Sequence, residues 1–328
     1  FKYYVCDGHY RRYCVHFCRR YVVACQQQTQ KGRLKTVSDG LKSTVLFSIK
    51  HFGKISMKRI ISLLFIACPV LASAAPDNDK AAVQAVIAKY YNRPLAAHKC
   101  QLAKPPKDSE TASDNIMYCM KPVADHTVTR NGTPTRYVLY TGFAYDMEQK
   151  VKQDAHASSG LAELFVLEKA DGKWAIKQHG SDEIGAWGDV PENKDWRFVQ
   201  MGEQNWGYTV ESGYTGQGET TTGENFLFTD NSNRVRKSLI INGNDNGAYF
   251  GDCDELKGRE KRNCKDRYTS LAAKIAFDKS RPAVSGVWAL AAKLSGVSGK
   301  KNYKNQKYIF PYNGKTHVAP QNYPLGGQ

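Results

Sequence analysis

The chain has 328 residues, a formal net charge of +16 and 41% hydrophobic residues. Residues 1–74 carry 13 Lys or Arg but only 2 Asp or Glu, so residues 75–328 hold 34 basic and 29 acidic residues, a net charge of +5. That charge is ordinary and gives no argument for an anionic partner. We therefore expect no nucleic-acid partner.

Residues 57–74 have the three parts of a secretory signal peptide. Met57 is followed by Lys58 and Arg59, then by an apolar run over residues 60–72 and an Ala-Ser-Ala triplet ending at Ala74. A cationic start, a short apolar run and small residues at the cleavage site are typical of exported proteins. The run is shorter than the roughly 20 residues that a membrane-spanning helix needs. We expect cleavage near Ala74 and no transmembrane segment in the mature chain.

Residues 1–56 contain no Met and precede the expected signal peptide. We expect this segment to be upstream reading frame or the result of a mis-set start, and so not part of the native protein. Read literally, Cys14 and Cys18 with His16 between them suggest a zinc site. A basic, Tyr-rich nucleic-acid-binding arm is a further literal interpretation. We favour neither interpretation. For the zinc site, the established spacings between ligands are not met on both sides of the candidate site.

Four cysteines remain in the mature chain, and an even number in an exported protein favours disulfides. Closeness in sequence favours Cys100–Cys119 and Cys253–Cys264 among the three possible pairings. A metal site is not expected, because no CxxC occurs. The fifth cysteine, Cys68, lies in the signal segment and suggests an alternative, a lipoprotein anchored through its thiol.

The first half of the mature chain predicts a helix followed by strands. Residues 77–93 carry apolar side chains at helical spacing, and Pro94 ends the helix. Residues 98–121 are predicted to be irregular. Two hairpins follow, with Asn-Gly and Asp-Gly at their turns; their strands are His126–Arg130 with Thr135–Tyr145, and Leu161–Lys169 with Trp174–His179.

This element order resembles the cystatin or NTF2-like arrangement, in which an N-terminal helix lies on an antiparallel sheet. The resemblance covers residues 75–185 and rests on element order alone. It implies an α+β fold and no particular activity.

A Gly-, Pro- and charge-rich break at residues 185–195 separates a β-rich second half, so we predict domains at 75–185 and 186–328. Residues 254–278 fit a helix and a strand equally well. The other predicted strands are Trp196–Met201, Trp206–Tyr214, Asn225–Phe228, Ser238–Ile241, Val287–Leu294, Lys307–Pro311 and Thr316–Val318.

Catalytic and metal-binding motifs are not found after residue 75: GxSxG, HExxH, Walker A and CxxC are all missing. His126, His156 and His179 fall in the first predicted sheet or its loops, where three imidazoles would have to converge to bind a metal. With nearby Asp and Glu residues they could instead serve an exported hydrolase.

Residues 242–247 resemble the first half of a calcium loop, but Cys253 stands where the bidentate Glu belongs. We expect no metal and no cofactor.

Aromatic residues are dense in the second half and give the sharpest functional hypothesis. Alternation places Trp206, Tyr208 and Val210 on one face of a strand, as a core face would require. The competing hypothesis is an exposed platform for a glycan or an envelope protein. Its candidate binding residues are Trp187, Trp196, Trp206, Tyr208 and Tyr214.

These patterns predict a disulfide-stabilised α+β protein of the bacterial cell envelope, periplasmic or secreted, that acts by binding rather than by catalysis. The alternative is an exported hydrolase using His, Asp and Glu from residues 75–185.

Overall fold

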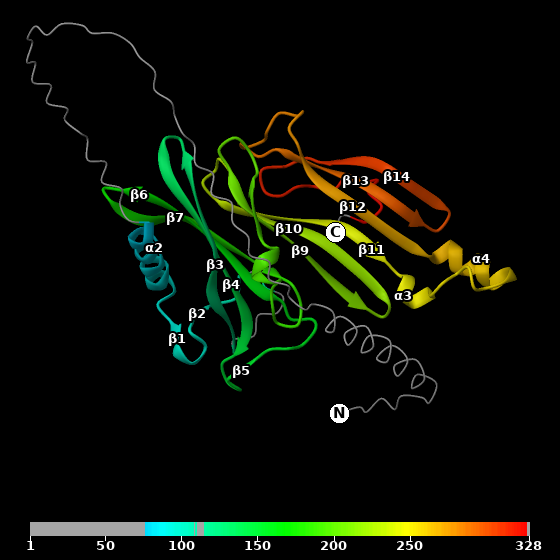
Figure 1. Cartoon of the computed structure of the whole chain (residues 1–328), viewed down its shortest axis with the longest axis horizontal. Helices are drawn as coiled ribbons and strands as arrows, with labels where there is room; N and C mark the ends of the chain where they lie inside the picture. The colour runs from blue at the N-terminus through cyan, green and yellow to red at the C-terminus, as the bar shows by residue number, and fades with distance from the viewer. Residues whose placement is uncertain (1–75, 108, 110–114, 327–328) are drawn as a thin grey trace, which may run out of the picture. The chain divides into compact units, whose positions relative to one another are not determined.

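Two-residue turns create the hairpins of the first half, as their sequence predicts. A computed structural model describes residues 76–107, 109 and 115–326 (Figure 1). Strand β3 (Ile116–Arg130) turns into β4 (Thr133–Asp146) through Asn131 and Gly132, whose φ angles are 49° and 78°. Two positive φ values give the backbone twist that a tight hairpin needs, and Asn and Gly tolerate them best. The Asp-Gly turn at residues 171–172 is built in the same way.

The first sheet has seven antiparallel strands in the order β1-β2-β3-β4-β6-β7, with β5 paired to β4. Strand β4 is central and pairs along most of its length with both β3 and β6. The remaining strands are β1 (Pro94–Leu95), β2 (Cys100–Ala103), β5 (Val151–Lys152), β6 (Gly160–Ala170) and β7 (Lys173–Ile184).

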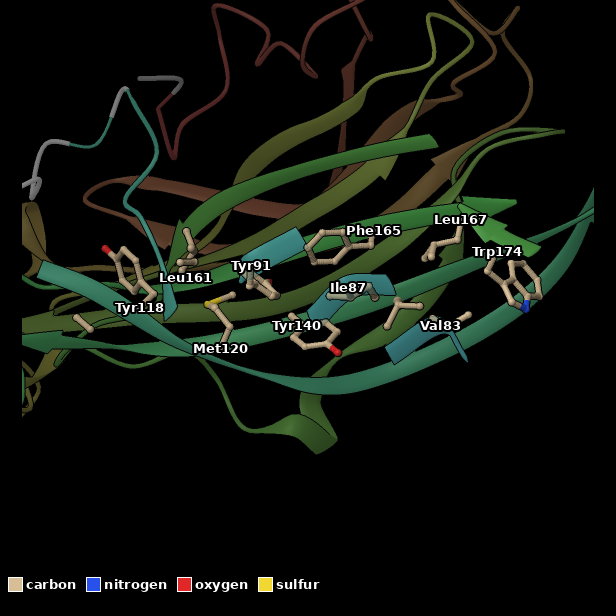
Figure 2. Packing of buried hydrophobic residues seen from close by; sticks show 13 residues of the cluster. Val83, Ile87, Tyr91, Tyr118, Met120, Tyr140, Leu161, Phe165, Leu167 and Trp174 are labelled. Atoms are coloured by element: carbon tan, nitrogen blue, oxygen red, sulfur yellow. The ribbon is translucent and has the colours of Figure 1, made fainter. Parts of the chain in front are cut away.

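Helix α2 (Pro76–Tyr91) covers one face of this sheet. Val83, Ile87 and Tyr91 recur at helical spacing and are buried against the sheet. Figure 2 shows these side chains among Tyr140 and Phe165, which come from β4 and β6. The rings of Tyr91 and Phe165 meet edge to face with centroids 5.6 Å apart. The predicted N-terminal helix is therefore confirmed.

The second sheet also has seven antiparallel strands, in the order β14-β13-β12-β11-β10-β9-β8. Apolar side chains on one of its faces form a core that the C-terminal residues complete, with Tyr312 and Tyr323 buried there. The strands are β8 (Arg197–Gln200), β9 (Trp206–Gly216), β10 (Glu219–Thr229), β11 (Val235–Asp245), β12 (Thr269–Asp278), β13 (Ala289–Ser298) and β14 (Lys301–Phe310).

The two sheets share a third apolar core. Tyr208 and Val210 of β9 are buried with Tyr137 and Leu139 of β4. The Tyr208 hydroxyl donates to the backbone oxygen of Tyr137 over 2.9 Å, so the buried phenol is also satisfied as a hydrogen-bond donor. The described residues belong to one compact unit. Whether 75–185 and 186–328 are separate domains stays a prediction.

The predicted α+β class is wrong. The described residues are mostly β, arranged in two antiparallel sheets, and α2 is the only helix longer than ten residues among them. Residues 98–121, predicted to be irregular, contribute β2 and the start of β3. Their backbone groups pair with distant strands, and local composition does not reveal such pairing. The ambiguous segment 254–278 divides into α4 (Gly258–Arg267) and β12.

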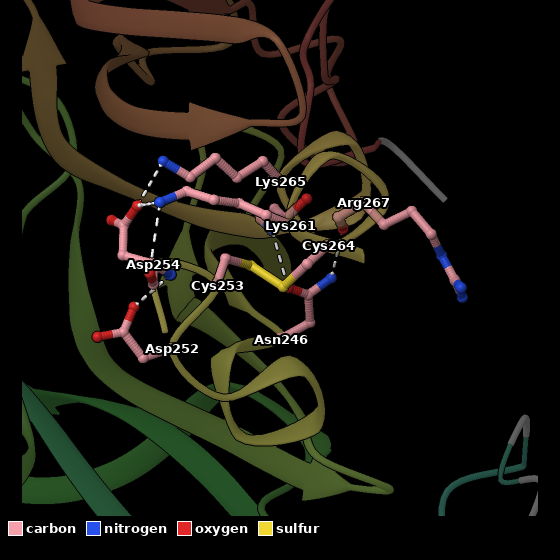
Figure 3. The surroundings of a disulfide bond; sticks show 9 residues. Asn246, Asp252, Cys253, Asp254, Lys261, Cys264, Lys265 and Arg267 are labelled. Carbon is pink, nitrogen blue, oxygen red and sulfur yellow. Dashed lines mark hydrogen bonds and ion pairs between the residues drawn. A yellow bond between two sulfur atoms is a disulfide. The ribbon is translucent and has the colours of Figure 1, made fainter. Parts of the chain in front are cut away.

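Both predicted disulfides are confirmed, Cys100–Cys119 and Cys253–Cys264. The second fastens α4 to the loop after the short helix α3 (Gly247–Phe250). In Figure 3 Asp254 lies beside this bond and pairs with Lys261 and Lys265, at 2.9 and 2.7 Å. Disulfides are compatible with a compartment outside the cytoplasm.

The expected signal peptide at 57–74, Cys68 and the preceding segment 1–56 lie outside the described residues. In the part of the chain that is described, no helix is long and apolar enough to cross a membrane.

Candidate functional site

A cavity of about 790 Å³ lies between β12 and the strands β8 to β11 of the second sheet. Its polar lining consists of Lys194, Asp195, Arg197, Thr209, Glu211, Glu224, Asn242 and Lys274. Its apolar lining includes Val199, Phe226, Ile275, Phe277 and Leu290, of which Val199 and Phe226 share a strand face with Arg197 and Glu224. A cavity of this size with a few converging polar groups is the usual form of a small-ligand site.

Glu224 is the most buried charged group of the cavity, with 7% of its surface exposed. Its Oε1 accepts a hydrogen bond from Nη2 of Arg197 at 2.5 Å and another from the Thr209 hydroxyl. A carboxylate in this position needs such partners, because desolvating an unpaired charge is costly. Among the described residues, no hydrogen bond or ion pair is recorded for its Oε2. That oxygen is the natural acceptor for a ligand.

Glu211 lies directly opposite Glu224 in the register of β9 and β10. Its Oε2 accepts from Nδ2 of Asn242 at 2.7 Å, and Asn242 is oriented by the hydroxyl of Thr222 at 2.8 Å. Like charges placed directly opposite on adjacent strands destabilise a sheet. Arg197 bonds only Glu224 of the two carboxylates. The lining as a whole holds three basic residues, Lys194, Arg197 and Lys274, and three acidic ones, Asp195, Glu211 and Glu224, so the negative charge is local to the facing carboxylates.

The apolar lining of the cavity comes mainly from β12. Ala273, Ile275 and Phe277 alternate along the strand and are only half-buried. They offer hydrophobic contact within the cavity, to which the same strand also contributes Lys274. The cavity can therefore recognise a ligand with a cationic or hydroxyl-bearing group at one end and an apolar group at the other.

Similarity to known proteins does not assign this cavity. No protein-family model, no curated protein and no solved structure matches the chain. The chemistry of the lining side chains therefore has to indicate what it does. The groups of the lining that could act as acids or bases are the carboxylates of Asp195, Glu211 and Glu224. No cluster of three or more His, Cys, Asp or Glu in the described part of the chain could hold a metal ion.

The five aromatic residues predicted to bind do not share one environment. Tyr208 and Trp196 are buried in the core between the sheets, so neither can belong to an exposed platform. Trp206 is half-buried against the same core. Trp187 and Tyr214 are exposed, at 57% and 48%. The alternation that places Tyr208 on an inward face is the reason for its burial.

Trp187 is the most exposed of these aromatic residues and has an unusual backbone. Its φ is 59°, a left-handed conformation that is uncommon for a bulky residue. Its ring stacks on His156 with centroids 4.8 Å apart. Such strain is often retained at functional loops. A role for Trp187 in binding stays a prediction.

The three histidines proposed for a metal or hydrolase site have different neighbours. His126 stacks on Phe198 and pairs with the Tyr208 hydroxyl, while His156 stacks on Trp187. His179 lies beside Glu163, with Nδ1 and Oε1 3.4 Å apart, and beside Tyr90. Only His179 therefore approaches a carboxylate among the three.

The calcium-like loop at 242–247 has most of its polar groups engaged in internal bonds. Asn242 bonds Glu211, and Oδ1 of Asp245 accepts the backbone N–H of Gly247. The side chain of Asn246 accepts from the backbone of Thr269. Cys253, at the position of the missing calcium ligand, is in a disulfide. Residues 242–245 form the end of strand β11, and residues 243–245 pair with both β10 and β12, so the predicted turn is strand up to Asp245, and Gly247 begins α3.

Sequence reasoning missed Arg197, Glu211 and Glu224. A signal for the two glutamates was present in the hairpin that joins β9 to β10. Its turn residues Gln217 and Gly218 have φ values of 53° and 80°. A two-residue turn sets the register of the strands on either side, and it places Glu211 opposite Glu224.

Proposed function

We propose that the protein is an exported, non-catalytic binding protein, periplasmic or secreted, that holds its ligand in the cavity of the second sheet. The signal-like segment 57–74 and the two disulfides support export. The partner is a segment of an envelope protein or a glycan, and binding needs no cofactor.

One observation carries this proposal: Glu211 and Glu224 lie opposite each other on adjacent strands and line a cavity that also has apolar lining residues. Packing and folding do not need two facing carboxylates, which cost stability. A ligand group with hydrogen-bond donors, such as an amine, a guanidinium or several hydroxyls, would satisfy their free oxygens.

The rival function, an exported hydrolase, has one observation in its favour. His179 and Glu163 are adjacent, and the hydroxyls of Tyr90 and Tyr91 reach Glu163. The two phenols are poor nucleophiles, however. Burial and the neighbouring Glu163 raise the pKa of Tyr90 to about 12 and raise the pKa of Tyr91 well above its ordinary value. We therefore interpret this cluster as a hydrogen-bonded edge of the contact between α2 and the first sheet, and not as a hydrolytic site.

A ligand panel would test the proposal. The full chain is exported from a bacterial host, and the purified protein is screened by thermal unfolding against synthetic hexapeptides and oligosaccharides. We expect a bound ligand to raise Tm, since it stabilises only the folded state. Glu224→Gln should remove that rise, because the amide loses the charge that attracts the ligand.

Glu203→Gln is the matched control, because Glu203 is exposed and does not line the cavity. It should leave the Tm rise unchanged. Mass spectrometry of each ligand after incubation should return it intact. Cleavage that disappears in Glu163→Gln or His179→Ala would establish the hydrolase instead. If no ligand of the panel raises Tm in a way that depends on Glu224, the proposal that this cavity binds the ligand is wrong.

A further inference from the structure

Strand β12 is an interior strand of the second sheet, yet half of it has a partner on one side only. It pairs with β13 over its whole length, from Thr269 to Asp278. Its pairing with β11 is confined to residues 270–272. Beyond Ala272 the two strands separate, and β12 presents a free edge at residues 273–278.

This edge is open to solvent along most of its length. None of residues 272–277 is buried, whereas Leu271 and Asp278 on either side of them are. In the described part of the chain, the only backbone hydrogen bonds recorded for 273–278 are those to β13. In an antiparallel strand alternate residues direct both N–H and C=O to the same side. About half of these six residues therefore direct unpaired backbone groups away from β13.

The free edge borders the proposed ligand cavity. Residues 273–277 all line the cavity, so it reaches both faces of the strand. Natural proteins usually cover or shorten such edges, because an unpaired strand recruits another chain. Lys274 supplies one protecting charge, but Ala273, Ile275, Ala276 and Phe277 leave the rest of the edge small or apolar. An edge of this length beside a cavity has the form of a strand-addition site.

We propose that an extended peptide adds to β12 at residues 273–278, with a Lys or Arg side chain reaching Glu224 and Glu211. The inference rests on the proposed function and names the ligand class for that cavity. Apolar side chains of the peptide contact Ile275 and Phe277. A basic side chain is favoured locally, where Glu211 and Glu224 face each other and Arg197 bonds only Glu224, although Lys194 and Lys274 balance the charge of the lining as a whole. A glycan could use the carboxylates, but it offers no backbone ladder to the strand edge.

Selection from a phage-displayed library of linear hexapeptides would identify the peptide pattern. The enriched sequences should alternate apolar residues with Lys or Arg, because successive side chains of a strand point to opposite faces. Binding of a synthetic selected peptide is then measured by fluorescence anisotropy. Glu224→Gln should weaken it by about tenfold or more, which is about 1.4 kcal/mol. Glu203→Gln should leave it unchanged.

Two measurements test strand addition separately from cavity binding. Amide hydrogen exchange should slow at residues 273–278 when the peptide is added. Two peptides are compared, each with N-methyl groups on one of the two alternating sets of amides. The peptide whose methylated amides face β12 should bind at least tenfold more weakly, and the other should bind normally. Tight binding that depends on Glu224, without protection at 273–278, would overturn strand addition and leave the cavity proposal standing. So would binding of oligosaccharides alone. If neither peptides nor oligosaccharides bind in a way that depends on Glu224, both proposals are wrong.

Discussion

Glu211 on β9 lies directly opposite Glu224 on β10, and both carboxylates line one cavity. Facing like charges cost roughly 0.2–1 kcal/mol. Glu211→Gln should therefore raise the free energy of unfolding by up to about 1 kcal/mol at low salt while weakening the ligand. The gain should shrink at high salt, where repulsion is screened. Urea denaturation at two salt concentrations measures it, with Glu203→Gln as the control. A loss of stability would contradict the repulsion.

Removing the Cys253–Cys264 disulfide should loosen α4 more than the rest of the protein. Cys264 is the only buried residue of this highly charged helix, so little apolar packing holds it. Hydrogen exchange in the double variant Cys253→Ser, Cys264→Ser should accelerate in 253–267. The sheet strands should keep their protection. The matching double variant, Cys100→Ser with Cys119→Ser, removes the disulfide that links two strands of the first sheet. It should lower the global free energy of unfolding by about 3 kcal/mol. Equal global losses for both pairs would contradict this contrast.

His317 should make stability depend on pH below neutrality. Burial lowers its pKa to about 4 from 6.5, and its ring bonds Ser238 and the backbone of Trp288. Between pH 6.5 and 4 the unfolded state binds a proton that the folded state does not. Stability therefore falls as pH decreases through this window, by about 3 kcal/mol in all. His317→Gln should flatten this part of the curve in chemical denaturation. An unchanged slope would show that other groups cause it.

Tyr208 and Trp187 should respond oppositely to truncation. Tyr208 is fully buried between the sheets, so Tyr208→Ala should cost about 3–5 kcal/mol of stability. Trp187 is mostly exposed, and Trp187→Ala should change stability by less than about 0.5 kcal/mol. Thermal or urea unfolding gives both values. If Trp187 belongs to a binding surface, its loss should weaken ligand binding in a protein that still folds. A large loss of stability in Trp187→Ala would show a structural role instead.

The mature protein should begin at or near Ala75 when a bacterial host exports it. The apolar run and the Ala-Ser-Ala triplet before Ala75 form the expected cleavage site. N-terminal sequencing of periplasmic material measures this directly. Retention of residues 1–56 would contradict both the cleavage and the expectation that this segment is not native. A lipid on Cys68, detected by mass spectrometry, would favour the lipoprotein alternative.

Local features of this chain were readable from its sequence. Helix α2 at Pro76–Tyr91, predicted at 77–93, depends on neighbouring residues, and so do the turns at 131–132 and 171–172. The two cysteine pairs join residues at short separations. Backbone preferences of Asn and Gly, helical spacing and loop closure act over a few residues. For that reason they can be recognised before any tertiary contact is known.

The fold class and the cavity were decided only by the tertiary structure. Whether residues 98–121 form strands depends on distant partners, such as Asp146, which pairs with Ile116. Glu224 became a cavity residue because β12, some 50 residues later, separates from β11 and leaves a space beside it. Tyr208 became core and Trp187 surface although both are aromatic. Strand pairing and burial join residues distant in sequence, and the free energy of those contacts belongs to the assembled sheets rather than to any local segment.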